Sequence, residues 1–296
     1  MNDFSQNIQW FPGHMTRTLR MIEAEIRNID IIIEILDARI PKSSRNPELD
    51  RLAAGKPRLF LFNKCDLADK KVTADWVEFY KSEGYISLQI NSKEAGTRKT
   101  VICKVLDILH PIIEKRAKRG MVGVKPKVMV IGIPNVGKST FINTMSRSAS
   151  AKVADKPGVT RGKQWINAGE LDLLDMPGVL WPKFTSDDTA NHLAFTGAIN
   201  DSAIDVTLLT VSLLGVIKTK YRNALQNRYG IVFAPDTGAY DLFESIAKKR
   251  GMILAKNEID LIRASVMLLD ELRAGKLGRI SFENPDFSQN RVGDEG

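Results

Sequence analysis

An eight-residue segment near the middle of the chain constrains the fold most. Its sequence, Gly132-Ile133-Pro134-Asn135-Val136-Gly137-Lys138-Ser139, fits the pattern G-x-x-x-x-G-K-[ST]. The segment 127–131 before it, apolar from Val128, predicts a buried strand, and a helix is expected from Lys138. In this context, glycines let backbone N–H groups surround phosphate oxygens, and the helix N-terminus adds positive potential. The segment therefore predicts a phosphate-binding loop.

This loop assigns a role to each of its polar side chains. Lys138 is expected to neutralise the β- and γ-phosphates of a nucleotide, and the Ser139 hydroxyl to bind Mg²⁺. The residues expected to contact the nucleotide here are Asn135, Val136, Gly137, Lys138, Ser139 and Thr140.

Strands and helices alternate along residues 1–204, which predicts an α/β domain with a largely parallel sheet. Strands are expected at 29–36, 59–62, 85–90, 127–131, 164–167 and 170–174. Helices are expected at 46–54, 73–80 and 97–119, with Thr73 as a helix cap. From residue 205 the pattern is helical, with helices expected at 206–229, 240–250 and 257–274. We therefore expect a nucleotide-binding domain over 1–204 with an N-terminal arm at 1–20, a smaller all-helical domain over 205–280, and a flexible tail at 281–296.

A second motif, Asn63-Lys64-Cys65-Asp66, follows the expected strand 59–62 and predicts recognition of guanine. The Asp66 carboxylate can accept hydrogen bonds from N1–H and the 2-amino group of guanine, a donor pair that adenine lacks. Asn63 can contact the other edge of the base, and the aliphatic stem of Lys64 can cover its face. A pattern of four residues occurs by chance, but beside a phosphate-binding loop it indicates that GTP is preferred to ATP.

A third motif, Asp175-Met176-Pro177-Gly178, fits D-x-x-G and follows the expected strand 170–174. Asp175 would hold Mg²⁺, usually through water, and the Gly178 N–H would meet the γ-phosphate. Thr160 lies between this motif and the phosphate-binding loop. A threonine there can close over the γ-phosphate and complete the Mg²⁺ shell, although an ordinary loop threonine fits the sequence as well. Loss of the γ-phosphate would release both segments, which gives a switch.

The order of these motifs is unusual, because the base-reading motif precedes the phosphate-binding loop. Circular permutation explains the order, since the termini of α/β domains often lie close together. With the segments Trp10-Phe11-Pro12-Gly13-His14-Met15 and Asp37-Ala38-Arg39-Ile40-Pro41, the chain resembles the circularly permuted ribosome-assembly GTPases of the YlqF/RbgA group. The resemblance extends to Gly275-Lys276-Leu277-Gly278-Arg279. It implies a permuted Ras-like P-loop GTPase domain and a helical C-terminal domain that contacts ribosomal RNA. It also implies slow GTP hydrolysis that the particle stimulates, late in maturation of the large ribosomal subunit.

The resemblance also nominates individual residues. Asn91-Ser92-Lys93 is the best match to the loop that supports the base, usually Ser-Ala-Lys or close to it. Val179 stands where many GTPases have the glutamine that orients the attacking water, so another group must act. The resemblance nominates His14, which would orient or deprotonate water. Alternatively, His14 only helps to dock the N-terminal arm or contacts RNA. Asn135 would support a bound K⁺, or is an ordinary turn residue.

The charge of the chain favours a polyanionic partner. Its 43 Lys and Arg residues outnumber 35 Asp and Glu residues, giving a net charge of +8. Between Lys93 and Lys127, ten basic residues stand against three acidic ones, which fits either nucleic-acid contact or a solvated helix face with a basic linker. A second basic segment, Lys248-Lys249-Arg250, fits either RNA contact or a solvated helix end. The apolar runs are too short to span a membrane. Cys65 and Cys103 are not in a CxxC pattern, so a cytoplasmic protein with reduced thiols is expected. We also expect a monomer.

Three functions fit these observations. The first is a GTPase timer that binds GTP and Mg²⁺, with K⁺ as a further cofactor, docks on a large-subunit precursor and its rRNA, and leaves after hydrolysis to GDP. The second is an RNA-binding module in which the nucleotide mainly sets conformation and hydrolysis is incidental. The third is a signalling GTPase for a protein partner, which the basic stretch disfavours.

Overall fold

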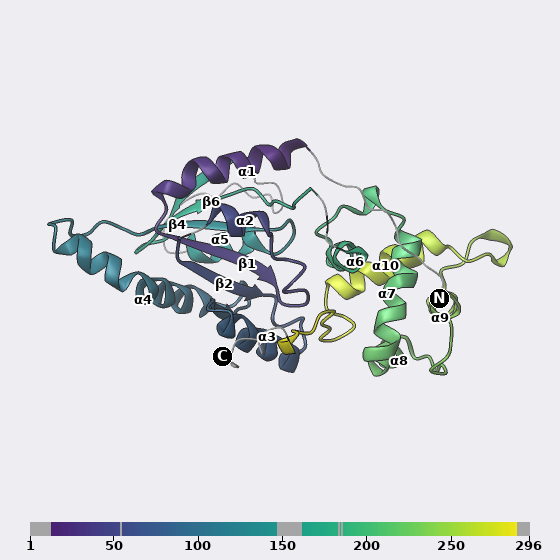
Figure 1. The fold of residues 1–296 in the computed structure, drawn as a ribbon. Coiled ribbons are helices and arrows are strands. Elements are labelled where there is room, and N and C mark those ends of the chain that lie inside the picture. Colours follow the sequence, from purple (N-terminus) through teal and green to yellow (C-terminus); the bar gives the residue numbers. More distant parts are fainter. Residues whose placement is uncertain (1–12, 54, 147–161, 183, 185, 289–296) are drawn as a thin grey trace. The chain divides into compact units, whose positions relative to one another are not determined.

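The computed structural model describes residues 13–53, 55–146, 162–182, 184 and 186–288. The described chain forms two compact units, of which the larger comprises residues 13–182 and 283–288. This unit contains a six-stranded sheet (Figure 1). Its strands are β1 (Ile31–Asp37), β2 (Arg58–Asn63), β3 (Ile86–Gln89), β4 (Lys127–Gly132), β5 (Gln164–Asn167) and β6 (Asp172–Asp175). Their order is β3-β2-β1-β4-β6-β5; β5 runs antiparallel to β6 and the other neighbours are parallel, which confirms the predicted α/β class.

Parallel pairing places the carboxyl ends of β1, β2, β3, β4 and β6 along one edge of the sheet. The phosphate-binding loop follows β4, which lies between β1 and β6. The guanine motif follows β2, and Asp175 ends β6. The three motifs therefore meet at one edge although their order along the chain is permuted.

The three central strands β1, β2 and β4 are mostly apolar and buried, because both faces of the sheet are covered there. All residues of β1 are buried. On one side, α3 (Lys70–Ser82) packs Trp76 and Tyr80 against Phe60 and Phe62 of β2. Elsewhere α4 (Thr97–Ala117) and α5 (Lys138–Ser146) pack together, and Arg98 of α4 donates a hydrogen bond to the carbonyl oxygen of Met145 at 3.1 Å. The α-helices α1 (Gly13–Glu25) and α2 (Glu48–Leu52) also belong to this unit, and a short 3-10 helix, Ile26–Asn28, follows α1.

Three expected helices have boundaries that are clearly wrong. The helix expected over 257–274 begins at Leu261, where the Asp260 side chain caps it and accepts a hydrogen bond from the Arg263 N–H. The helix expected from Thr73 begins at Lys70, because the Asp69 carboxylate caps it and accepts hydrogen bonds from the N–H groups of Lys71 and Val72 at 2.9 and 3.1 Å. The helix expected over 206–229 is two helices, α7 (Val206–Lys220) and α8 (Arg222–Tyr229), because Tyr221 leaves the helical conformation.

The smaller unit is helical and covers the described residues of 184–282. It contains α6 (Asp187–Phe195), α7, α8, α9 (Ala239–Lys249) and α10 (Leu261–Arg273), with α7 in contact with the other four. Arg273 of α10 donates to the carbonyl oxygens of Ala194 and Phe195 in α6 at 2.9 and 3.2 Å. Because α6 belongs to this unit, the two units divide near residue 183, whereas the change of pattern predicts a boundary at 204. No helix in the described ranges is both long and apolar enough to cross a membrane.

The start of the expected tail is anchored to the larger unit. The Glu283 carboxylate accepts hydrogen bonds from the N–H groups of Lys42 and Ser43 at 2.7 and 3.0 Å, and it also contacts the Ser43 hydroxyl. Its backbone carbonyl accepts a hydrogen bond from the Trp76 indole at 3.2 Å. The predicted flexible tail over 281–296 therefore begins with a bound segment, and residues 289–296 lie outside the described residues.

Candidate nucleotide-binding site

The phosphate-binding loop connects β4 to α5 and turns through two left-handed residues. Asn135 has a φ of 57° and Gly137 a φ of 96°. A Cβ atom at Gly137 would lie 2.3 Å from the side-chain nitrogen of Asn63, so the position requires glycine. Along the loop, Val136 and Lys138 are buried, Gly137 and Ser139 are half-buried, and Asn135 and Thr140 are exposed.

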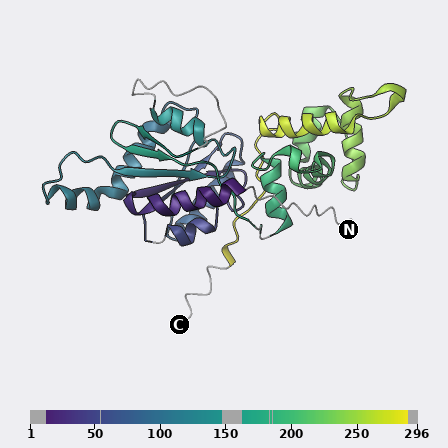
Figure 2. The same ribbon diagram turned by 90° about the horizontal axis from the view of Figure 1, so that it is seen from above.

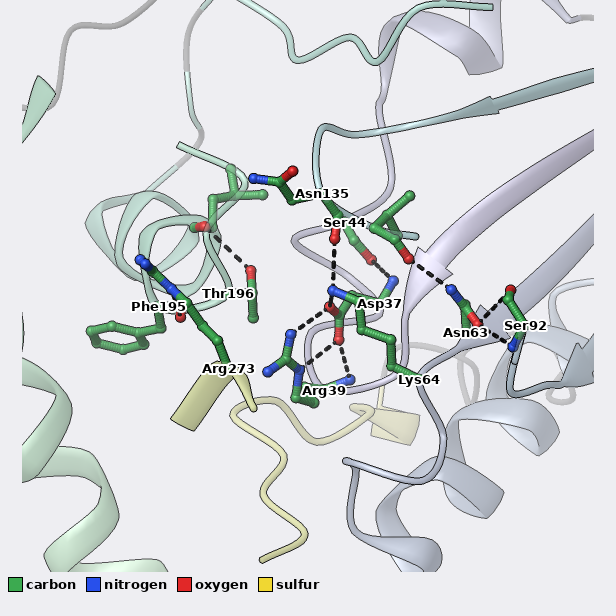
Figure 3. A network of polar contacts seen from close by, with 12 residues as sticks. Asp37, Arg39, Ser44, Asn63, Lys64, Ser92, Asn135, Phe195, Thr196 and Arg273 are labelled. Atoms are coloured by element: carbon green, nitrogen blue, oxygen red, sulfur yellow. Dashed lines mark hydrogen bonds and ion pairs between the residues drawn. The ribbon is translucent and has the colours of Figure 1, made fainter. Parts of the chain in front are cut away.

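Asn63 joins the phosphate-binding loop to the Asn91-Ser92-Lys93 loop. Its side-chain nitrogen donates a hydrogen bond to the carbonyl oxygen of Val136 at 2.8 Å. Its side-chain oxygen accepts hydrogen bonds from the backbone nitrogen and the hydroxyl of Ser92 at 3.0 and 2.8 Å (Figure 3). Asn63 is 2% exposed, so it is an internal brace that fixes the two loops against each other.

Lys64 makes the second link to the phosphate-binding loop. Its Nζ atom donates a hydrogen bond to the carbonyl oxygen of Asn135 at 2.7 Å and pairs with the Asp37 carboxylate at 2.9 Å (Figure 3). Lys64 has a φ of 60°, which turns the chain sharply at the end of β2. These contacts hold the aliphatic stem of Lys64 beside the phosphate-binding loop, where the predicted guanine base would lie.

Asp37 and Arg39 form a buried ion pair beneath Lys64. The Nε and Nη2 atoms of Arg39 donate to the two carboxylate oxygens of Asp37 at 2.9 and 2.8 Å. Both side chains are about 2% exposed or less. Burial alone would raise the pKa of Asp37, but the charges of Arg39 and Lys64 and their hydrogen bonds hold that pKa well below its usual value. Asp37 therefore stays ionised and keeps the Lys64 ammonium in place.

The other two elements expected around the base lie at the same edge. Asp66 is half-buried and interacts electrostatically with the charges of Arg39 and Lys64. In the Asn91-Ser92-Lys93 loop, Ser92 is buried and Lys93 is exposed, and the half-buried Asn91 accepts a hydrogen bond from the Lys93 N–H at 3.0 Å. The Ser92 carbonyl oxygen accepts a hydrogen bond from Thr144 of α5 at 2.6 Å, which ties this loop to the helix that follows the phosphate-binding loop.

The two residues expected to act on phosphate and Mg²⁺ contact each other. The Lys138 ammonium pairs with the Asp175 carboxylate, and both side chains are 7% exposed. Ser139 lies one residue along α5 from Lys138. A hydroxyl and a carboxylate oxygen are the hard ligands that Mg²⁺ prefers, so this donor set fits a Mg²⁺ ion bound with phosphate oxygens and water. Within the described chain there is no cluster of three or more His, Cys, Asp and Glu side chains that would form an all-protein metal site.

The segment after Asp175 lies directly against the phosphate-binding loop. A Cβ atom at Gly178 would lie 3.0 and 3.1 Å from the backbone nitrogen and Cα of Pro134. The Val179 N–H donates to the carbonyl oxygen of Gly132 at 3.2 Å, and Val179 is fully buried. A buried valine cannot orient water through its side chain, which agrees with the prediction that hydrolysis depends on another group.

The structure does not describe the side chains of two predicted site residues, His14 and Thr160. His14 is in the first turn of α1, but its side chain is not described. Its neighbour Met15 is buried, and the Met15 sulfur accepts a hydrogen bond from the Leu180 N–H at 3.3 Å, so the start of α1 packs against the segment after Gly178. Thr160 lies outside the described residues.

Asp37 and Arg39 are the main site residues to which sequence reasoning assigned no role. The segment that contains them carries part of the family resemblance, which implies no function for either residue. Their signal was available in the sequence, because an acid and a base stand at the carboxyl end of an expected buried strand. A charged pair at that edge of a parallel sheet is expected to face the site.

Comparisons with known proteins agree with this geometry. A family model described as a 50S ribosome-binding GTPase matches residues 127–234. The chain is 40% identical over 293 residues to the ribosome biogenesis GTPase A of Bacillus cereus, with 97% of each chain covered. It is 31% identical to the bovine mitochondrial ribosome-associated GTPase 1, with 97% of this chain and 91% of that protein covered.

Solved structures give the same result. The crystal structure of GNP-bound YlqF from T. maritima matches with a TM-score of 0.63 and 28% identity, covering 90% of this chain and 97% of that one. The GDP-bound structure of the T. maritima protein matches with a TM-score of 0.62 and 27% identity, covering 90% of this chain and 99% of that one.

Proposed function

Because this chain belongs to the ribosome biogenesis GTPase A family, we propose that it is an assembly factor for the large ribosomal subunit. It is a GTPase of a family of ribosome-assembly proteins with a circularly permuted P-loop domain. In the proposed cycle, the GTP-bound monomer docks on a large-subunit precursor and its rRNA in the cytoplasm. The particle accelerates an otherwise slow hydrolysis, and the GDP-bound protein leaves.

The observation that carries this proposal is the pair of links between the guanine motif and the phosphate-binding loop. Asn63 bonds to Val136 and Lys64 bonds to Asn135, at 2.8 and 2.7 Å. One motif is expected to read the base and the other to hold the phosphates. Since these links join the two segments, they support binding of one guanine nucleotide across both.

The phosphate chemistry follows from the positions of the side chains. Lys138 would exchange the Asp175 carboxylate for β- and γ-phosphate oxygens, and the N–H groups of the loop would hold the same phosphates. Ser139 and Asp175 would hold Mg²⁺, with Thr160 as the proposed third protein ligand, and Mg²⁺ when bound would neutralise phosphate charge. The Gly178 N–H would donate to the γ-phosphate. Loss of that phosphate would release the Gly178 segment and Thr160, and so switch the protein.

The attacking water needs a group other than Val179. We assign this role to His14, whose helix α1 packs against the segment after Gly178 through Met15 and Leu180. A neutral imidazole near pH 7 can orient water or accept its proton. Asn135 is proposed to support a K⁺ ion whose charge would assist at the bond between the β- and γ-phosphates; it is exposed on the loop with its backbone in a left-handed turn.

The experiment that tests the function compares GTP turnover with and without purified large ribosomal subunits, in K⁺ and in Na⁺ buffer. We expect acceleration by the subunits, greatest in K⁺. His14→Ala should lose the acceleration and keep GTP binding and docking. A wild-type protein that large subunits do not accelerate would refute the timer.

Base recognition is tested with Asp66→Asn. An amide in place of the carboxylate cannot accept both donors of guanine, so GTP affinity should fall by at least about tenfold, since a charge-assisted hydrogen bond contributes about 1.5–3 kcal/mol. Affinity for XTP should rise, because xanthine carries an acceptor where guanine carries an amino group. An unchanged preference for GTP would refute the assignment of Asp66.

The alternative is a nucleotide-switched RNA-binding module in which hydrolysis is incidental, and the basic charge of the chain favours it equally. This alternative predicts that Lys138→Ala weakens RNA affinity, whereas His14→Ala changes neither turnover nor ribosome assembly. Loss of particle-stimulated turnover in His14→Ala, with docking retained, decides for the timer.

A further inference from the structure

The end of α4 and the loop that follows it form a basic projection, here defined as residues 115–127. Both views show α4 and this loop extending beyond the strands of the sheet (Figures 1 and 2). The projection contains six basic residues and no acidic one. Lys115, Lys118 and Arg119 are exposed. Three apolar residues also face solvent there, namely Met121, Val122 and Val124, which are 48%, 80% and 47% exposed.

This projection is held in shape by one carboxylate. Asp30 accepts a hydrogen bond from Arg116 Nη1 at 3.0 Å and a second, short one from Nη2, and it also accepts one from the Lys127 N–H at 2.9 Å. Asp30 therefore binds both arms of the projection, at the end of α4 and the start of β4. Within the loop, the Gly120 and Met121 N–H groups bond back to Ala117 and Arg116 at 2.9 and 3.0 Å. The cations are thus displayed on an ordered support.

An exposed aromatic ring lies at the base of the projection. Trp165 of the edge strand β5 is 44% exposed, and the Lys127 ammonium lies 5.9 Å from its ring centroid. Trp165, Lys127, Asn167 and Asp172 are among the residues that line a hollow of about 510 Å³. A large ring exposed on an edge strand beside a cation is the arrangement on which nucleic-acid bases stack.

We propose that the basic projection and Trp165 together form an RNA-binding surface for an unpaired strand of rRNA, an inference that rests on the proposed function. Lys115, Lys118 and Arg119 bind backbone phosphates, and a base stacks on Trp165 with Asn167 beside it. The apolar side chains of Met121 and Val122 pack against sugars or bases.

The position of the basic projection makes its role separable from nucleotide binding. The basic projection lies where α4 ends and β4 begins, at the edge of the sheet opposite the carboxyl ends that carry the phosphate-binding loop. Trp165 lies farther along the sheet, paired with Leu174 of β6. The cations favour a polyanionic partner. RNA is favoured over an acidic protein because the exposed Trp165 ring beside these cations can stack on bases. Of the acidic groups nearby, Asp30 pairs with Arg116 and Glu25 pairs with Lys163. Glu114 is exposed and lies 3.9 Å from His110, and Asp172 is half-buried.

The test uses the full-length protein and two probes, a single-stranded uridine homopolymer and purified large ribosomal subunits. The variant Lys115→Gln/Lys118→Gln/Arg119→Gln removes three cations of the projection. Its matched control, Lys70→Gln/Lys71→Gln/Lys81→Gln, removes three lysines from α3 of the same unit, two of which pair with Asp75 and Glu78. Binding is measured over a series of KCl concentrations, and GTP turnover without subunits verifies that each variant is folded.

We expect the projection variant to bind the homopolymer at least about tenfold more weakly than wild type. The slope of log affinity against log salt concentration should be smaller in magnitude by about 2, because each of the three lost phosphate contacts contributes about 0.7 to this slope on a single strand. The control should keep the wild-type slope. Trp165→Ala should weaken binding by about fivefold or more, and Trp165→Phe should restore most of it, because stacking needs a ring.

Equal binding and slope in wild type and the projection variant would overturn this surface while leaving the proposed function intact. The same conclusion follows if the control loses as much affinity, or if Trp165→Phe is as weak as Trp165→Ala. Preferential binding of the projection to an acidic polypeptide over the homopolymer would also reject it. A wild-type protein that binds neither probe would reject the function and the surface together.

Discussion

The side-chain nitrogen of Asn63 lies 2.8 Å from the carbonyl oxygen of Val136, seventy-three residues away in the chain. Because Asn63 also accepts two hydrogen bonds from Ser92, one buried amide holds the loops at the ends of β2, β3 and β4. The order in which these loops occur along the chain is irrelevant to this contact, which explains how a permuted chain can keep a GTPase site.

Replacing Asn63 should therefore cost both stability and nucleotide affinity. Asn63→Ala leaves the Val136 carbonyl and the Ser92 N–H buried without their partner, which costs about 1–3 kcal/mol of unfolding free energy. GDP affinity should fall as well, because the phosphate-binding loop is no longer fixed. Urea unfolding and fluorescence titration with a labelled GDP measure the two effects. Thr100→Ala is the control, because its hydroxyl is on the exposed side of α4 and donates a local hydrogen bond to the Gly96 carbonyl oxygen. Wild-type stability and affinity in Asn63→Ala would contradict the brace.

Much of this site was predictable from the sequence, for a physical reason. Glycine-rich loops, Asn-Lys-x-Asp and D-x-x-G each combine a local backbone requirement with a chemical one, so the identity of a few neighbouring residues specifies them. Apolar runs of β-branched residues likewise located the strands. Helix ends were harder, since Asp69 and Thr73 both fit a cap and only the folded backbone selects Asp69.

Contacts between distant segments could not be predicted. Asp37, Arg39 and Lys64 form a charged cluster because β1 and β2 are neighbours, and sequence spacing does not contain that information. The bond between Glu283 and Ser43 joins residues 240 positions apart. For the same reason, the change of sequence pattern near residue 204 does not show that α6 associates with α10 through Arg273.

GTP binding should require glycine at position 137, whereas Gly96 of the same unit should tolerate replacement by alanine. Gly137→Ala forces a Cβ to within 2.3 Å of Asn63 at a φ of 96°, so we expect loss of measurable GTP binding and a lower thermal midpoint. Gly96→Ala is the matched control, because its φ is −68° and nothing lies within 4 Å of the added atom. That variant should be neutral or more stable by up to about 1 kcal/mol, through the unfolded state. Equal GTP affinity of the two variants would show that the loop tolerates a side chain at 137.

The acid stability of the protein should depend on Asp37. Its pKa is lower in the folded chain than in the unfolded one, because the charges of Arg39 and Lys64 outweigh the effect of burial. A lowered pKa means that the unfolded state binds the proton more readily, so Asp37 contributes its full stability above about pH 4 and loses it progressively as the pH falls further. At pH 7, Asp37→Asn should lower the unfolding free energy by about 3–5 kcal/mol, because Arg39 is left buried without its charge partner.

Urea unfolding of wild type and Asp37→Asn between pH 7 and pH 3 measures this effect. The difference in unfolding free energy between the two proteins should be largest at neutral pH and should become smaller below about pH 4. Asp75→Asn provides the control, since Asp75 makes a solvent-exposed pair with Lys71 that contributes about 0.5 kcal/mol or less. A difference for Asp37→Asn that stays constant with pH would show that the lost stability is not electrostatic.

The segment that starts at Glu283 should be held to the larger unit by its side chain. The carboxylate binds two backbone N–H groups, of Lys42 and Ser43, in the loop that follows the Asp37–Arg39 pair. Glu283→Ala removes these acceptors and leaves the bond from the Trp76 indole to the backbone carbonyl in place. We expect a loss of about 1–3 kcal/mol in unfolding free energy and faster proteolysis after residue 282. Glu78→Ala is the control: Glu78 lies on the exposed side of α3, where it pairs with Lys81, so neither measurement should change. If Glu283→Ala matches this control in both measurements, the carboxylate makes no net contribution, and other contacts anchor the segment, such as the Trp76 indole bond and the packing of Phe287 against Phe79.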